Sequence, residues 1–153
     1  MTQNEKYMKQ ALKEAKKAFE KQEVPIGAVI VKDGKIISRA FNKREINNVA
    51  TAHSEILAIE KACKKLGSWR LNDCDIYVTL EPCPMCAGAI LNSRIRNLYF
   101  GALDEKSGAV VSNAKILDLD GNFCNHKVEY EGEVLKDECQ GLIKEFFSTL
   151  RKK

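Results

Sequence analysis

Four side chains in two short segments have the types and spacing of a metal site. Cys83 and Cys86 form a Cys-x-x-Cys pair, and His53 lies two residues before Glu55. Two thiolates at this spacing reach one ion, and an imidazole is a third ligand that zinc accepts. A structural zinc site uses four protein ligands, whereas three leave a position for water. The pattern therefore predicts one Zn²⁺ per chain, held by His53, Cys83 and Cys86, with Glu55 beside it as a proton carrier.

Both segments are predicted to lie where a helix begins. The apolar spacing predicts a helix from Ser54 to Leu66, which Gly67 ends, and Pro84 suits the first turn of another that continues to Leu91. The free N–H groups and the dipole at a helix N-terminus favour thiolate over thiol, as metal binding requires.

The remaining pattern predicts an α/β fold. Asp33-Gly34 is a strong hairpin signal between two β-rich segments. The predicted strands are residues 25–31, 35–41, 75–80 and 96–101, and the other predicted helices are residues 7–19 and 135–150. An opening hairpin followed by alternating strands and helices predicts a mixed central sheet with helices on both faces. No linker or repeat interrupts the chain, so a single domain of residues 1–153 is expected.

Composition excludes several classes of protein. The chain has 153 residues, 44% hydrophobic and 30% charged, which is typical of a globular domain and not of a disordered chain. No apolar run reaches the roughly 20 residues that span a bilayer, and no secretory signal is visible, so a cytoplasmic protein without a membrane is expected. The net charge of +4 does not by itself indicate nucleic acid.

The cysteines outside the metal pattern are assigned to the core or to turns. Cys63 and Cys139 lie on apolar helical faces and are expected to be buried free thiols. Cys74 and Cys124 are expected in turns. For His126 we expect a structural or packing role.

The His-x-Glu and Pro-Cys-x-x-Cys motifs together are the signature of the zinc-dependent cytidine and adenosine deaminase superfamily. Within it, the chain resembles the bacterial tRNA-specific adenosine deaminases over almost its whole length. The segments that carry the resemblance are residues 23–30, 51–56, 67–71, 77–89, 100–104, 125–126 and the ending Phe146-Phe147…Arg151.

This resemblance implies a three-layer α/β/α fold of the cytidine deaminase type and a homodimer. It implies hydrolytic deamination of adenosine to inosine at the wobble position of a tRNA anticodon, with Glu55 moving protons. It also places Asn42 at a base-binding position and Asp104 near the RNA backbone. From their chemistry alone, Asn42 could orient a flipped base or end a strand, and Asp104 could bind a ribose 2′-OH or be a solvated loop acid. Lys106 could meet a phosphate or be solvated.

The C-terminal segment is the other candidate RNA contact. Phe146 and Phe147 are adjacent, so on a helix they point about 100° apart. One is expected to pack inward with Leu142, Ile143 and Leu150. The other, Phe147 in our assignment, is expected to stack on a base beside the cations Arg151, Lys152 and Lys153.

Three alternative hypotheses use the same residues. A thiol–disulfide protein could use Cys83 and Cys86, but no proline lies downstream to face the pair, and His53 and Glu55 would have no role. A binding module with a structural zinc lacks a fourth ligand. A deaminase of a free base or nucleoside would share the metal site, and this alternative stays open. The chain departs from the family pattern on the substrate side of the site and not at the metal ligands. These departures are at Ser54, Leu103, Val110-Val111 and residues 47–50.

Overall fold

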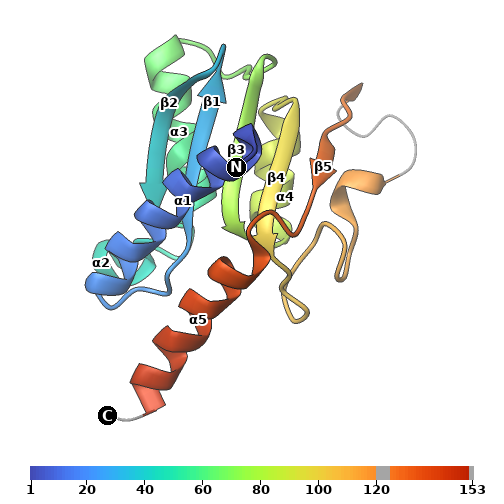
Figure 1. Ribbon diagram of the computed structural model, residues 1–153. Helices are drawn as coiled ribbons and strands as arrows, with labels where there is room; N and C mark the ends of the chain where they lie inside the picture. Colours follow the sequence, from blue (N-terminus) through green and yellow to red (C-terminus); the bar gives the residue numbers. More distant parts are fainter. Residues whose placement is uncertain (120–124, 152–153) are drawn as a thin grey trace.

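In the computed structural model, which describes residues 1–119 and 125–151, five strands form one mixed sheet in the order β2-β1-β3-β4-β5 (Figure 1). The strands are β1 (Gly27–Lys32), β2 (Lys35–Phe41), β3 (Cys74–Leu80), β4 (Asn97–Ala102) and β5 (Glu129–Glu131). Strand β1 pairs antiparallel with both β2 and β3, whereas β3, β4 and β5 are parallel.

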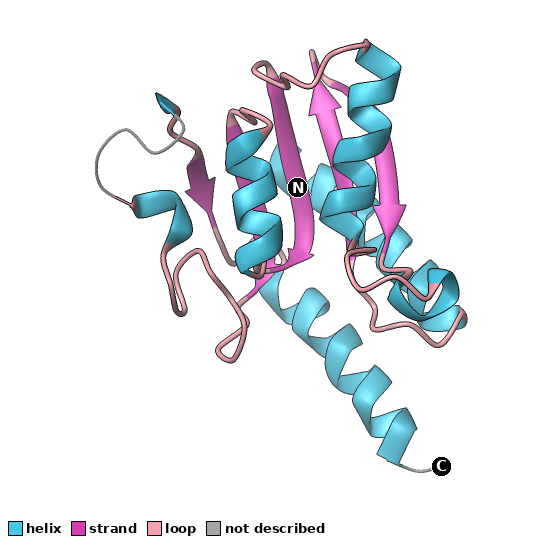
Figure 2. Ribbon diagram, turned by 180° about the vertical axis from the view of Figure 1, so that it is seen from behind, coloured by secondary structure: helices cyan, strands magenta, loops and turns pink. Residues whose placement is uncertain are grey.

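Helices cover both faces of the sheet, as the sequence predicts. One face carries α1 (Gln3–Glu20) and the start of α5 (Lys136–Arg151), and the other carries α3 (Ser54–Leu66) and α4 (Pro84–Asn92) (Figures 1 and 2). The short helix α2 (Arg44–Asn47) follows β2, and a 3-10 turn occupies Ile116–Asp118. The three-layer α/β/α prediction is confirmed. Among the described helices, none has the length and apolarity needed to cross a bilayer.

Alternation along β1 divides the core between the two faces. Ala28 and Ile30 pack in the cluster beneath α3 and α4, whereas Val29 and Val31 pack with Met8 of α1. All five are at most 5% exposed. The strand therefore has no solvent-facing side, which explains why its sequence is continuously apolar.

The strand directions place the starts of α3 and α4 together. Because β1 is antiparallel to both of its neighbours, β2 runs parallel to β3 and to β4. Helix α3 connects β2 to β3, and α4 connects β3 to β4. Both helices cover the same face, so both begin at the edge of the sheet where β2, β3 and β4 end (Figure 2).

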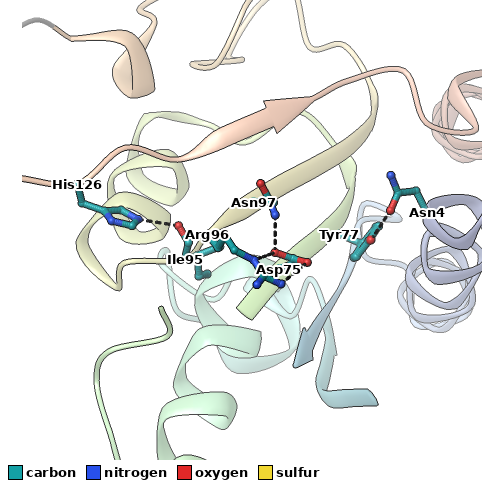
Figure 3. Close-up of polar contacts among 7 residues, drawn as sticks. All are labelled: Asn4, Asp75, Tyr77, Ile95, Arg96, Asn97 and His126. Atoms are coloured by element: carbon teal, nitrogen blue, oxygen red, sulfur yellow. Dashed lines mark hydrogen bonds and ion pairs between the residues drawn. The ribbon is translucent and has the colours of Figure 1, made fainter. Parts of the chain in front are cut away.

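A polar network fixes the opposite edge (Figure 3). The Arg96 guanidinium donates from Nε and Nη2 to the two carboxylate oxygens of Asp75, each at 3.1 Å, and Asn97 donates to the same carboxylate at 2.9 Å. These bonds join the beginnings of β3 and β4. Two residues after Asp75, a separate hydrogen bond from the Tyr77 hydroxyl to Asn4, at 2.6 Å, joins the middle of β3 to the start of α1.

The structure agrees with most of the predictions for His126 and for the cysteines outside the metal pattern. His126 contacts the Ile95 carbonyl through Nε2 at 2.8 Å, which is a structural role (Figure 3). Cys139 is buried and Cys63 is half-buried. The turn predicted at Cys74 is wrong: Cys74 is the first residue of β3 and faces the core beneath α3. Cys124 lies outside the described residues.

Several boundaries differ from the prediction. Helix α1 begins at Gln3 because Thr2 and Glu5 form a capping box, with the Thr2 hydroxyl accepting from the Glu5 amide. Helix α5 begins at Lys136, since Leu135 has a positive φ of 52°. Leu150 stays 44% exposed, because α5 extends past the sheet and only its Cys139 and Phe146 are buried.

Helix α5 approaches the sheet closely at one glycine. A Cβ on Gly101 of β4 would collide with Cys139 Sγ and with the Thr79 carbonyl. Gly101 therefore sets how closely the start of α5 packs on β4.

We predict that Gly101→Ala lowers the free energy of unfolding by about 1–3 kcal/mol, because the added methyl group overpacks this contact. Gly141→Ala on the exposed side of α5 is the matched control, since a Cβ there meets nothing within 4 Å. It should stabilise the helix by roughly 0.5–1 kcal/mol. Urea unfolding followed by circular dichroism measures both, and equal stability of the two variants would contradict the prediction.

Candidate active site

The structure brings the three predicted metal ligands to one point. His53 is the N-cap of α3, Cys83 is the N-cap of α4, and Cys86 lies in the first turn of α4. Their donor atoms all lie within 4.8 Å of one another. His53 Nδ1 is 3.6 Å from the Sγ atom of Cys83 and 3.6 Å from that of Cys86.

These distances fit a tetrahedral zinc ion. With Zn–N near 2.0–2.1 Å and Zn–S near 2.3 Å, tetrahedral geometry separates a nitrogen ligand from a sulfur ligand by about 3.6 Å. The donor set of one imidazole and two thiols is also one that zinc accepts. No further His, Cys, Asp or Glu within the described ranges joins this group. The site is thus suited to a metal ion with an open position.

The pKa shifts within the cluster also indicate a cation site. Hydrogen bonds from Cys86 and His53 lower the pKa of Cys83 to about 4, although burial opposes this shift. The hydrogen bond between Cys83 and Cys86, together with burial, raises the pKa of Cys86, and the contact with Cys83 raises the pKa of His53. The three donors therefore compete for protons at one point, and a cation at that point satisfies all of them.

Glu55 lies in the first turn of α3, one residue after a buried serine. Its side chain is 4% exposed, and burial raises its pKa, although the hydrogen bond from Ser54 opposes this shift. Ser54 Oγ donates to Glu55 Oε1 at 2.8 Å. One carboxylate oxygen is thus held by the neighbouring hydroxyl. A carboxyl group whose proton affinity is raised by burial suits proton transfer near neutral pH.

A cleft of about 1090 Å³ opens onto this cluster. His53, Glu55 and Cys83 line its floor, while Cys86 is fully buried beneath. Its walls come from the segment before β1, from α2, from the loop after β4 and from one side of α5 along most of its length. The predicted substrate residues Asn42, Asp104, Lys106 and Phe147 all line it.

Asn42 and Asp104 also organise the backbone of the cleft walls. The Asn42 amide donates to the Val24 carbonyl at 3.2 Å and accepts from the Arg44 amide at 3.2 Å. Within the described residues, one N–H of Asn42 and one lone pair on its oxygen have no hydrogen-bond partner. The Asp104 carboxylate accepts from the backbone amides of residues 106 and 107. Each side chain thus has a structural role beside any role in binding.

The two adjacent phenylalanines divide as predicted. Phe146 is buried at 5% exposure, with its ring 5.6 Å from that of Phe19, whereas Phe147 is 41% exposed in the cleft. Arg151 lies outside the cleft lining, and its Nε donates to the Phe147 carbonyl at 3.5 Å. Lys152 and Lys153 lie outside the described residues.

Sequence reasoning missed the role of Glu81, which precedes the Pro-Cys pair. Its carboxylate accepts hydrogen bonds from the backbone amides of Asp104, Val110, Val111 and Ser112 and from the Ser112 hydroxyl. Burial opposes ionisation, yet these donors lower the pKa of Glu81 below its ordinary value. Its position beside the metal motif was the only signal in the sequence.

Glu23 has a similar role on the opposite wall. It is 1% exposed and accepts from the amides of Glu45 and Ile46 at 3.1 and 2.6 Å, which caps α2. Both walls of the cleft are therefore held by buried carboxylates that accept backbone N–H groups.

Known proteins resemble this chain in sequence and in fold. A family model described as MafB19-like deaminase matches residues 2–151. The chain is 54% identical to the tRNA-specific adenosine deaminase of Bacillus subtilis (strain 168), and the alignment covers 100% of this chain and 94% of that protein. The chain belongs to the bacterial tRNA-specific adenosine deaminase family.

A second relative and a solved structure support this family membership. The deaminase is 51% identical to the tRNA-specific adenosine deaminase of Aquifex aeolicus (strain VF5), over 96% of this chain and 95% of that one. A solved structure from a study of A-to-I editing by tRNA:A34 deaminases at the wobble position matches it with a TM-score of 0.85. That match has 45% identity and covers 90% of this chain and 98% of the other.

We predict that Glu81→Gln loosens the loop after β4 and destabilises the deaminase by roughly 2–3 kcal/mol, because an amide replaces a carboxylate that accepts five donors. Ser112→Ala removes one donor side chain and should cost about 1 kcal/mol.

The pH dependence of stability also distinguishes Glu81→Gln from the wild type. The folded-state pKa of Glu81 is lowered, so its contribution to stability is present above its ordinary value of 4.5 and is lost as pH falls below it. Urea unfolding should show that the free energy of unfolding falls less between pH 7 and pH 3 for Glu81→Gln than for the wild type. Parallel pH profiles would contradict the assignment.

Proposed function

We propose that this protein deaminates adenosine to inosine by hydrolysis at the wobble position of a tRNA anticodon. The observation that carries the proposal is the pairing of a His53, Cys83 and Cys86 cluster with buried Glu55 on the floor of an open cleft. Family membership at 54% identity supports the tRNA substrate. The reaction converts adenosine and water to inosine and ammonia.

One zinc ion per chain would be held by His53, Cys83 and Cys86, whose donor chemistry and 3.6 Å spacing fit it. The ion would supply a Lewis acid at the open position, able to lower the pKa of a water there toward about 7.

Glu55 is the proposed proton carrier. Its carboxylate takes the proton that the attacking water loses and delivers it to N1 of adenine, while the water oxygen adds to C6. Glu55 then takes the proton of the new C6 hydroxyl and passes it to the amino group, so that ammonia departs as the C6–N bond breaks and the C6=O bond of inosine forms. Burial in the first turn of α3 and the hydrogen bond from Ser54 hold the carboxylate in place.

The walls of the cleft supply the proposed substrate contacts. The free N–H and lone pair of Asn42 would orient the flipped base, and Asp104 would accept from a ribose hydroxyl. Lys106 would meet a phosphate, Phe147 would stack on a neighbouring base, and Arg151 would bind the backbone beyond it. The exposure of Phe147 in the cleft supports this arrangement.

The organisation of the protein follows the family. We propose one deaminase domain of residues 1–153, a homodimer whose two subunits both contact the tRNA, and a location in the cytoplasm. Size-exclusion chromatography with light scattering tests the dimer.

Glu55→Gln should retain zinc and the fold but lose activity by roughly 10²–10⁴-fold, because it removes the proton carrier and no ligand. Cys86→Ala is the contrasting variant and should lose most of its zinc. Elemental analysis of the purified variants and an inosine assay measure both effects. Loss of zinc from Glu55→Gln would show that the carboxylate is a ligand instead.

The substrate is tested by offering the zinc-loaded protein an anticodon stem-loop with adenosine at the wobble position, and separately adenosine, cytidine, adenine, cytosine and guanine. We expect inosine in the stem-loop and negligible turnover of the free compounds. The matched control is a stem-loop with the adenosine moved one position along the loop. Faster turnover of any free base or nucleoside would favour the alternative function, because those deaminases share the metal site.

A further inference from the structure

The exposed side of α1 carries a row of lysines that the proposed catalysis does not use. Lys6, Lys9, Lys13 and Lys16, here called the lysine stripe, are all exposed. At 100° per residue they fall within an arc of about 80° and extend over roughly 15 Å of helix axis. In the part of the chain that the structure describes, none of these four ammonium groups lies within 4.0 Å of a carboxylate. Their charges are therefore available to an external partner.

The lysine stripe leads toward the cleft. Helix α1 crosses its face of the sheet and ends near α2, which is one of the elements that line the cleft (Figure 1). Gln22 and Glu23, which follow the helix, line the cleft, and Phe19 packs against Phe146 of α5. A polyanion that reaches the cleft can thus extend along α1 without leaving the surface.

The chemistry of α1 favours a nucleic acid over a membrane. A helix that binds a membrane surface inserts its apolar side among the lipids. Here that side is already buried: Met8, Ala11, Ala15 and Ala18 are each 0% exposed. What remains is a row of cations, which matches the regularly spaced phosphates of a duplex and supplies counterion release on binding.

We propose that the lysine stripe binds the phosphate backbone of the paired stem next to the anticodon loop, while the loop occupies the cleft. This inference rests on the proposed function, because it takes the substrate to be a tRNA. In this proposal α1 contributes to the affinity for the RNA, and its lysines lie on a surface separate from the residues that contact the base. Single-stranded nucleotides fill the cleft, and the duplex lies on the stripe.

The test compares the zinc-loaded wild type with the quadruple variant Lys6→Gln, Lys9→Gln, Lys13→Gln and Lys16→Gln. The control removes four exposed lysines elsewhere, by Lys64→Gln, Lys65→Gln, Lys115→Gln and Lys127→Gln. Binding is measured by fluorescence anisotropy from 50 to 200 mM salt, with anticodon stem-loops of short and long stem. Melting curves of all three proteins check the fold.

For the long stem we expect the stripe variant to reduce the slope of log K against log salt by about 3–4, close to 0.9 for each phosphate that a lysine no longer neutralises. The control should keep the wild-type slope. With the short stem, all three proteins should bind alike, and kcat at saturating stem-loop should be unchanged.

Equal slopes for the stripe variant and the control on the long stem would overturn the proposal, as would the same reduction on both stems. Binding of the wild type to phosphatidylserine vesicles that disappears in the stripe variant while RNA binding is kept would assign the stripe to membranes and also overturn it. Failure of the proposed function is distinguishable, because the wild type would then produce no inosine in either stem-loop.

Discussion

The metal site depends on the parallel direction of three strands. Since β2, β3 and β4 point the same way, the two helices that connect them must each begin at the same edge of the sheet. Each connection returns over the same face, as the preferred hand of such crossovers requires. His53 and Cys83, separated by 30 residues, are therefore brought into contact by topology. Each side chain need only occupy the N-cap position of its helix.

The floor and the walls of the cleft are built by different interactions. The floor is fixed by helix starts on a buried sheet. The walls are irregular segments, and the buried carboxylates of Glu81 and Glu23 hold them by accepting backbone N–H groups. Charge-assisted hydrogen bonds of this kind give a loop a defined shape without an apolar core of its own. Wall residues can thus change with little effect on the metal ligands.

Much of this arrangement follows from local patterns in the sequence. Hydrophobic periodicity located four of the strands and the four long helices, and ligand chemistry at two helix starts located the metal cluster. Helix α2 and strand β5 were not predicted, because a four-residue helix capped by Glu23 and a three-residue edge strand have too few residues to show a period. Cys74 was placed in a turn because the predicted strand began one residue later, whereas pairing with Lys32 of β1 extends β3 back to Cys74. The role of Glu81 was invisible because its donors lie 23 to 31 residues away.

Two buried side chains anchor helix α5, and their spacing determines how the helix can move. Cys139 rests on Gly101, and Phe146 rests on Phe19. The first interval is seven residues, about 10 Å, and the four residues from Phe146 to Leu150 add about 6 Å. With Phe146 as the pivot, an outward shift of about 1 Å at Cys139 would swing Leu150 inward by about 0.6 Å. The width of the cleft is therefore mechanically linked to packing at Cys139, a residue that does not itself line the cleft.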